Sequence, residues 1–251
     1  MVKQEDRIMN VALRPSFPMR LLLMLLAALP GYARPAAPEY PTKVIRLVVP
    51  FAPGGSNDIM ARIVAQQFTD SMKQQVVVDN RSGASGIVGT EIVAKAPADG
   101  YTILMMSLTF AVNPSLYRSL PYRTDKDFVP VTLVASAPLM LVVHPSVPAK
   151  SLKDLIAYAK ANPGRLNFGS GGQGTTPHLA GEMLKMMTGM EITHIPYKGG
   201  GPALADLVGG QIQLMLENIP STLPFVKSGK LRALAVSSLK RSPLEIGRAH
   251  V

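Results

Sequence analysis

Residues 48–62, VVPFAPGGSNDIMAR, constrain the fold more than any other stretch of the chain. An apolar, strand-like run enters a Pro/Gly turn, and residues 56–58 are all types that begin helices. Gly54 and Gly55 can adopt backbone angles closed to other residues and leave their N–H groups unobstructed. Because free N–H groups at a helix start carry partial positive charge, this strand, turn and helix can hold an anion. The plainer alternative is a tight connection between strand and helix that binds nothing.

Residues 167–182, NFGSGGQGTTPHLAGE, repeat this pattern of a short strand, a Gly/Ser loop and a helix start. A carboxylate between this loop and the loop at Gly54 would meet backbone N–H donors from both. The hydroxyls of Ser170, Thr175 and Thr176 can add neutral hydrogen bonds. The alternative is a glycine hinge in which Thr175 or Thr176 only caps the following helix.

From Val44 onward, short apolar runs alternate with amphipathic segments, which favours an α/β fold with mostly parallel strands. In such a sheet the loops at the carboxyl ends of the strands are the usual place for a ligand. The expected strands include residues 45–50, 76–79, 102–107, 128–135 and 139–144, and the expected helices include residues 58–72, 87–95 and 151–162. We interpret residues 113–127, with their prolines and charges, as the crossing into a second domain, and we expect Met183, Met186, Met187 and Met190 to fill a core.

The two ends of the chain are interpreted separately from the fold. Basic residues precede the apolar run 21–29, and small residues follow it, so residues 1–33 predict a signal peptide and a periplasmic protein. Without that segment the formal charge of +10 becomes +8, because four basic and two acidic side chains are lost. Residues 245–251 fit nothing before them, and we interpret them as a non-native tail that follows an early end of the coding sequence.

Composition and motifs exclude several functions. The chain has no cysteine, so disulfides and thiolate chemistry are excluded. Its basic residues are scattered and its aromatic content is 6%, which does not favour nucleic-acid binding. There is no GxSxG elbow, and nothing in the sequence places an acid behind His178. His144 and His194 lack the partners of a metal site. We therefore expect no catalytic residue, no metal and no cofactor.

Three separated segments carry a family resemblance: residues 50–62, residues 167–182, and residues 193–210, which read THIPYKGGGPALADLVGG. Together they resemble the Bug family, the extracytoplasmic solute-binding receptors of tripartite tricarboxylate transporters. The resemblance extends from about Tyr40 to Leu244. It implies a two-lobed, type II periplasmic-binding-protein-like fold, α/β in class, that closes on a small carboxylate. The family commonly has Asp where this chain has Gln213 and Glu217.

The resemblance also implies a domain organisation. Residues 34–112 and 231–244 are expected to form an incomplete first lobe, and residues 113–230 the second lobe. Because the first lobe would lack its remaining strands and helices, we expect the chain alone to be unstable or partly molten.

The expected function is capture of a small organic carboxylate between the lobes and its delivery to membrane transporter subunits, with transient contact to those subunits and a monomeric receptor. The alternative is an enzyme or a ligand-sensing domain on the same fold. Lys198 could face the anion or could be a solvated loop lysine, and Phe51 could wall the ligand or pack in the core. The expected ligand-binding residues are Phe51, Gly54, Gly55, Ser56, Asp58, Ser85, Ser107, Ser170, Gly171, Gly174, Thr175, Tyr197, Lys198 and Asn218.

Overall fold

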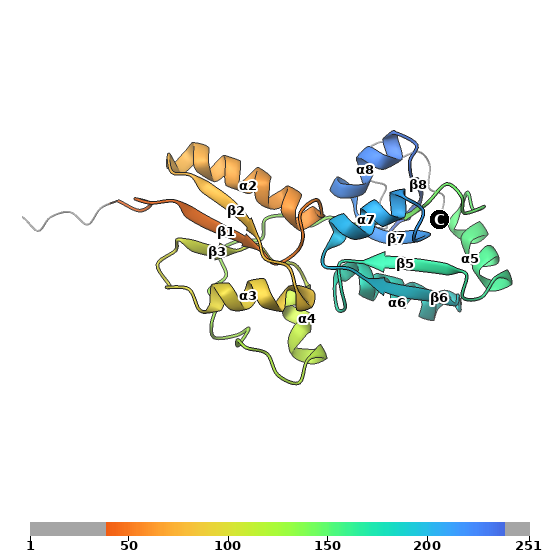
Figure 1. Cartoon of the computed structure of the whole chain (residues 1–251), viewed down its shortest axis with the longest axis horizontal. Helices are drawn as coiled ribbons and strands as arrows, with labels where there is room; N and C mark the ends of the chain where they lie inside the picture. The colour runs from red at the N-terminus through yellow and green to blue at the C-terminus, as the bar shows by residue number, and fades with distance from the viewer. Residues whose placement is uncertain (1–38, 239–251) are drawn as a thin grey trace, which may run out of the picture. The chain divides into compact units, whose positions relative to one another are not determined.

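The computed structural model describes residues 39–238, and its regular elements form two sheets with flanking helices (Figure 1). The predicted signal peptide and the predicted tail lie outside the described residues. No helix within residues 39–238 is both long enough and apolar enough to cross a bilayer.

The first sheet has three parallel strands in the order β2-β1-β3. Its strands are β1 (Ile45–Val49), β2 (Val76–Asn80) and β3 (Thr102–Leu104). Its helices are α2 (Ser56–Met72) and α3 (Ile87–Ala94), preceded by the short 3-10 turn η1 (Ala84–Gly86). Figure 1 shows α2 and α3 on opposite faces of this sheet. Alternate residues of β1 pack with Ala61 and Ala65 of α2, so the expected strand–turn–helix of the first motif is confirmed.

The second sheet has five strands in the order β6-β5-β7-β4-β8, of which β4 runs antiparallel to both its neighbours. Its strands are β4 (Leu139–Val143), β5 (Leu166–Ser170), β6 (Ile192–Pro196), β7 (Leu214–Asn218) and β8 (Arg232–Val236). Its helices are α5 (Leu152–Ala161), α6 (Thr176–Thr188), α7 (Gly200–Val208) and α8 (Ile219–Lys227).

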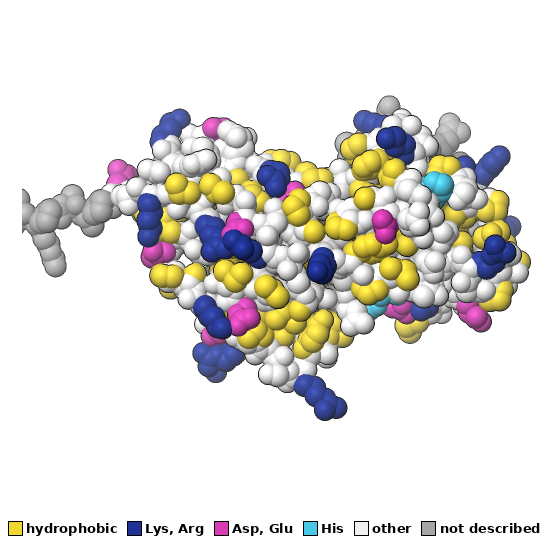
Figure 2. Space-filling view, in the orientation of Figure 1, with side chains coloured by type: hydrophobic (Ala, Val, Ile, Leu, Met, Phe, Trp, Pro, Cys, Tyr) yellow, Lys and Arg dark blue, Asp and Glu magenta, His cyan; other side chains and the backbone are white. Residues whose placement is uncertain are grey.

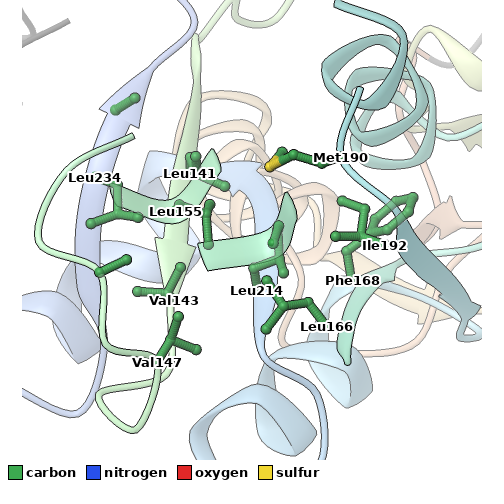
Figure 3. Close-up of a cluster of buried hydrophobic side chains, with 13 residues drawn as sticks. Leu141, Val143, Val147, Leu155, Leu166, Phe168, Met190, Ile192, Leu214 and Leu234 are labelled. Carbon is green, nitrogen blue, oxygen red and sulfur yellow. The ribbon is translucent and has the colours of Figure 1, made fainter. Parts of the chain in front are cut away.

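Strand periodicity divides the second core into two clusters, one on each face of the sheet. Leu141 and Val143 of β4 belong to the cluster that includes α5, and Met140 and Val142 belong to the cluster that includes α7. Successive side chains of a strand point to opposite faces, so a five-residue apolar strand serves both clusters. Figure 3 shows the first cluster, with Phe168 among its labelled side chains.

Three expectations about this part of the chain were wrong. Residues 128–135 form no strand, because the extended segment has no ladder partner among residues 39–238. The predicted crossing segment 113–127 begins inside helix α4 (Thr109–Leu116). Of the four methionines that were expected to fill a core, only Met190 is buried, and it lies just beyond the end of α6. The side chains of Met183, Met186 and Met187 are 61% to 86% exposed.

Strand β8 also differs from the expected lobe assignment. We expected residues 231–244 to return to the first lobe, but Arg232–Val236 pairs with β4 in the five-stranded sheet. The reason is that β4 offers a free edge on the side away from β7, and Leu234 and Ala235 pack into the core at that edge. Residues 239–244 lie outside the described part of the chain, and the remaining lobe boundaries stay a prediction.

The core of the second sheet predicts a large effect of truncating Phe168, whose side chain is fully buried. Phe168→Ala should lower the free energy of unfolding by about 3–5 kcal/mol, because it removes buried apolar surface and leaves a cavity. Met186→Ala, at a position 86% exposed, is the control and should change stability by less than about 0.5 kcal/mol. Urea denaturation followed by circular dichroism measures both values, and equal midpoints for the two variants would contradict this account.

Candidate functional site

A small cavity of about 50 Å³ lies where four helices begin, at the carboxyl ends of β1, β5, β6 and β7. Helix α2 begins at Ser56, α6 at Thr176, α7 at Gly200 and α8 at Ile219, directly after its N-cap Asn218. The cavity is therefore shared by the two sheets. Its lining consists of Phe51, Ala52, Gly55, Ser56, Asn57, Asp58, Ser107, Gly171, Thr175, Thr176, Pro177, Gly200, Glu217 and Asn218.

The N-termini of these four helices share one property. None of them has a side-chain hydrogen bond at its N-cap position. The first N–H groups of a helix have no partner within the helix, and they carry partial positive charge. No Lys or Arg lines the cavity. Any positive charge that the lining offers an anion therefore comes from backbone N–H groups and helix dipoles.

Backbone contacts hold the loops of the two sheets together beside the cavity. The N–H of Ala52, after β1, donates a hydrogen bond of 2.9 Å to the carbonyl oxygen of Lys198, after β6. Gly201 packs so closely that a Cβ atom there would overlap the carbonyl oxygen of Pro53. This approach of two backbones explains why the sequence has three consecutive glycines at 199–201.

Asp58 holds the first loop in shape. Its carboxylate accepts hydrogen bonds from the N–H of Gly54 at 3.0 Å and from the Asn80 side-chain amide at 3.0 Å. It also forms an ion pair with Arg62, one turn further along α2. Burial acts to raise the pKa of Asp58, but hydrogen bonds from Arg62, Gly54 and Asn80 outweigh it and hold that pKa below its usual value. Asp58 is therefore ionised at neutral pH and fully engaged by the protein.

Glu217, at the end of β7, is a second buried acid of the cavity, and it has no basic partner among the described residues. Its side chain is buried, and its Oε1 atom accepts hydrogen bonds from the Asn218 N–H at 2.9 Å and the Asn218 side chain at 3.2 Å. The Ser56 hydroxyl lies 3.4 Å from the same oxygen. Burial raises the pKa of Glu217, and these hydrogen bonds offset the effect only in part.

Ser56 connects the two sheets through side chains. Besides its contact with Glu217, its hydroxyl lies 3.0 Å from the hydroxyl of Ser221 on α8. All three side chains are buried. A buried polar link of this kind stabilises the juxtaposition of α2 and α8 only while every partner stays paired.

The structure brings eight of the fourteen predicted residues to the cavity. These are Phe51, Gly55, Ser56, Asp58, Ser107, Gly171, Thr175 and Asn218. Phe51 does both things that the sequence left open, because its ring packs in the core of the first sheet and also lines the cavity.

The other six predicted residues lie outside the lining, and several have identified partners. The hydroxyl of Ser170 contacts His194 at 2.7 Å, and the hydroxyl of Tyr197 donates to Asp206 at 2.7 Å. The N–H of Gly174 donates to His178. Gly54 donates to Asp58, and Lys198 contributes its backbone carbonyl to the contact with Ala52. Ser85 completes the set that the cavity does not include.

Six lining residues are not among the fourteen predicted ligand-binding residues: Ala52, Asn57, Thr176, Pro177, Gly200 and Glu217. Asn57 and Thr176 stand inside the two motifs and were available as helix-start residues. For Glu217 the only sequence signal was its position directly after the apolar run Leu214–Leu216, at the end of an expected strand.

Two histidines form a cluster behind the second loop. The rings of His178 and His194 lie 4.1 Å apart, and His194 contacts the Ser170 hydroxyl. Burial, followed by the nearby His178, lowers the pKa of His194 to about 4. No carboxylate hydrogen-bonds to either ring among residues 39–238, so the arrangement lacks the orienting acid of a catalytic triad. Within the same residues, no group of three His, Asp or Glu side chains is placed to hold a metal ion.

Two α/β units that direct helix N-termini at one shared cavity have the architecture of a bilobal binding protein. Comparison identifies the family. A sequence-family model described as the tripartite tricarboxylate transporter family receptor matches residues 60–244. The chain belongs to this family, the Bug-type solute-binding receptors, which is not an enzyme family.

The relatives agree with this assignment. Protein BugT of Bordetella pertussis is 46% identical over 228 residues, which cover 89% of this chain and 70% of BugT. A protein from Pseudomonas sp. strain P51 is 44% identical, and the match covers 81% of this chain and 61% of that protein. The chain thus spans between about three fifths and seven tenths of the length of these two relatives.

Solved structures share the fold. One described as a periplasmic transporter has 47% identity and a TM-score of 0.79, and the match covers 81% of this chain and 69% of that one. An R. palustris protein solved with adipate has 42% identity and a TM-score of 0.80, with coverages of 83% and 70%. MatC from Rhodopseudomonas palustris, solved with bound malate, has 31% identity and a TM-score of 0.74, with coverages of 81% and 70%.

The close approach at Gly201 yields a stability prediction. Gly201→Ala should destabilise the fold by about 1–3 kcal/mol, because the added methyl group overlaps backbone that cannot rotate away. Gly209→Ala, at the other end of α7, is the matched control, since its Cβ meets only ordinary contacts. Thermal unfolding of both variants measures the difference, and a Gly201→Ala protein as stable as the control would refute the contact.

The histidine cluster predicts a pH dependence. Because the pKa of His194 is about 4 in the folded protein and about 6.5 in an unfolded chain, the folded state binds fewer protons. The stability that the folded protein gains from a neutral His194 is therefore fully present above about pH 6.5 and is lost as the pH falls toward 4. His194→Gln should flatten the fall in melting temperature across this window, whereas His144→Gln, outside the cluster, should not. Parallel pH profiles for His194→Gln and the unmodified protein would contradict the assignment.

Proposed function

We propose that this protein is a periplasmic receptor that captures a small organic carboxylate in the cavity at Ser56 and Gly200 and delivers it to a tripartite tricarboxylate-type membrane transporter. The observation that carries the proposal is the convergence of four helix N-termini without side-chain caps on one cavity without Lys or Arg. Such N-termini bind carboxylates and phosphates through backbone N–H groups.

The lining residues support a site that binds a small acid through uncharged hydrogen-bond donors. The side chains of Asn57, Ser107 and Thr176 can donate hydrogen bonds to carboxylate oxygens. Asn57 stands out because no described residue hydrogen-bonds to its amide, so that both of its donors are available. The cavity is small, about 50 Å³, which favours a small acid over a peptide or nucleotide.

The relatives support both the ligand class and the location. Adipate and malate, which occupy two of the similar structures, are dicarboxylates. The family description names a tripartite transporter, and one similar structure is described as periplasmic. The predicted signal peptide at residues 1–33 supports export to the periplasm. We propose transient contact with the membrane subunits and a monomeric receptor.

The surface is consistent with an anion receptor that does not bind nucleic acid. On the face in Figure 2, Lys and Arg side chains are scattered among hydrophobic and uncharged ones and form no stripe. Closure of two lobes, one around each sheet, would bury the ligand, and the membrane partner would recognise the closed form.

A thermal-shift screen against di- and tricarboxylates, amino acids and aromatic acids tests the proposal, because a ligand that binds only the folded state raises the melting temperature. Asn57→Ala should reduce the shift given by the responding acid, with a loss of affinity of about tenfold or more. Gln67→Ala removes an exposed amide from the solvent side of the same helix and is the control. No shift with any carboxylate, or equal shifts for both variants, would count against this site.

A further inference from the structure

Glu217 is the one buried acid of the cavity that the proposed carboxylate receptor does not explain. Residues of β7 alternate between the two faces of the sheet, so Glu217 lies on the face of Met215, which is covered by α7 and α8. It is 4% exposed, and it lines the cavity together with Ser56 and Gly200. A carboxyl group thus stands where an anionic ligand is expected.

The two oxygens of Glu217 have different surroundings. All three neighbouring donors, from Ser56 and from the main chain and side chain of Asn218, are directed at Oε1. No donor among residues 39–238 hydrogen-bonds to Oε2, which lies beside Gly200 so closely that a Cβ atom there would be 2.7 Å away. Oε1 is therefore committed as an acceptor, and Oε2 is left for a proton or for a ligand.

Charged groups on the neighbouring elements do not neutralise Glu217. At the start of α2, Asp58 and Arg62 pair with each other, as do Glu182 and Lys185 on α6. Asp206 on α7 is bound by Tyr197, and Arg232 on β8 donates to the carbonyl oxygens of Val147 and Ala149. His178 and His194 contact each other and the second loop. The remaining ionisable side chains on these elements are Asp70, which accepts a hydrogen bond from Gln66 toward the end of α2, and Lys227, at the far end of α8. β4 and β5 have none.

An ionised Glu217 would repel a carboxylate bound in the same cavity. Two carboxyl groups that share a site without a cation do not both ionise, because the second charge is strongly disfavoured at short range. The four helix N-termini can compensate one negative charge far better than two. The ligand and Glu217 therefore compete for the same electrostatic stabilisation.

Building on the proposed function, we propose that Glu217 is neutral when a carboxylate occupies the cavity and donates a hydrogen bond from Oε2 to a ligand oxygen, so that binding is linked to a proton. Where the free site holds an ionised Glu217, one proton enters from solvent on binding and leaves when the ligand departs. No bond of the ligand is made or broken. A neutral carboxyl and a carboxylate then share one short, strong hydrogen bond.

Binding of adipate and malate measured by isothermal titration between about pH 6.5 and 8.5 tests this, since dicarboxylic acids are fully ionised in that range. The affinity of the unmodified chain should fall as the pH rises, approaching roughly tenfold per unit above the pKa of the ligand-free Glu217. Repeating the titration in buffers of different ionisation enthalpy should show uptake approaching one proton at the upper pH. Binding that is independent of pH, with no proton uptake, would overturn the proposal.

Two variants test whether the pH dependence of binding comes from the titratable proton of Glu217 or from the shape of its side chain. Glu217→Gln keeps the size of the group and a donor but cannot ionise, so it should bind with an affinity that does not change with pH. Glu91→Gln, in a surface ion pair on α3, is the control and should keep the profile of the unmodified chain. A Glu217→Gln profile that still falls with pH would also refute the role.

A third readout does not need a ligand. If neither probe binds any variant, the proposed function fails for these acids, and difference infrared spectroscopy of the free protein decides about Glu217. A protonated-carboxyl C=O band that is present at about pH 6.5, fades toward pH 8.5 and disappears in Glu217→Gln supports a carboxyl group that takes up and releases a proton in this range. The absence of that band in the unmodified protein even at about pH 6.5 would show that Glu217 takes up no proton there and would reject it.

Discussion

The site depends on unsatisfied backbone N–H groups at the starts of four helices. A helix cannot pair its own first N–H groups, so a side chain, water or a ligand must do so. In this protein α2, α6, α7 and α8 all begin at one cavity without side-chain caps. The arrangement keeps the donors available, and it explains how an anion can be bound without a lysine or an arginine in the lining.

Glycine makes this convergence geometrically possible. The loops after β1 and β6 touch through their backbones, and a side chain at Gly201 would push them apart. Asp58 adds rigidity, because it ties Gly54, Asn80 and Arg62 into one network at the base of the first loop. The donors are thus placed before any ligand arrives, which reduces the entropic cost of binding.

The two acids of the cavity carry the same carboxyl group, but their surroundings shift its pKa in opposite directions. Asp58 is surrounded by donors that include a guanidinium group and stays ionised, whereas Glu217 is buried with neutral donors only. The first holds the loop, and the second lines the cavity proposed to hold the ligand. Because Ser56 contacts both Glu217 and Ser221, a change of charge at Glu217 alters the hydrogen bonds that join α2 and α8.

Local patterns in the sequence determined the strand–turn–helix units. The alternation of apolar runs with Gly/Ser loops predicted β1 and α2, β5 and α6, and the placement of Gly55, Ser56 and Thr175 at helix starts, because backbone preferences and capping act over a few residues. The family followed from the order of three such motifs.

Only the tertiary structure decided which of these groups meet. Ser170 and Tyr197 stand in the right motifs, yet their hydroxyls are taken by His194 and Asp206, while Glu217 enters the cavity from a strand that its sequence marks only as apolar. β8 joined β4, and residues 128–135 stayed unpaired, because strand pairing depends on which edges are free. Long-range contacts of this kind depend on the register and packing of distant segments, which local preferences do not encode.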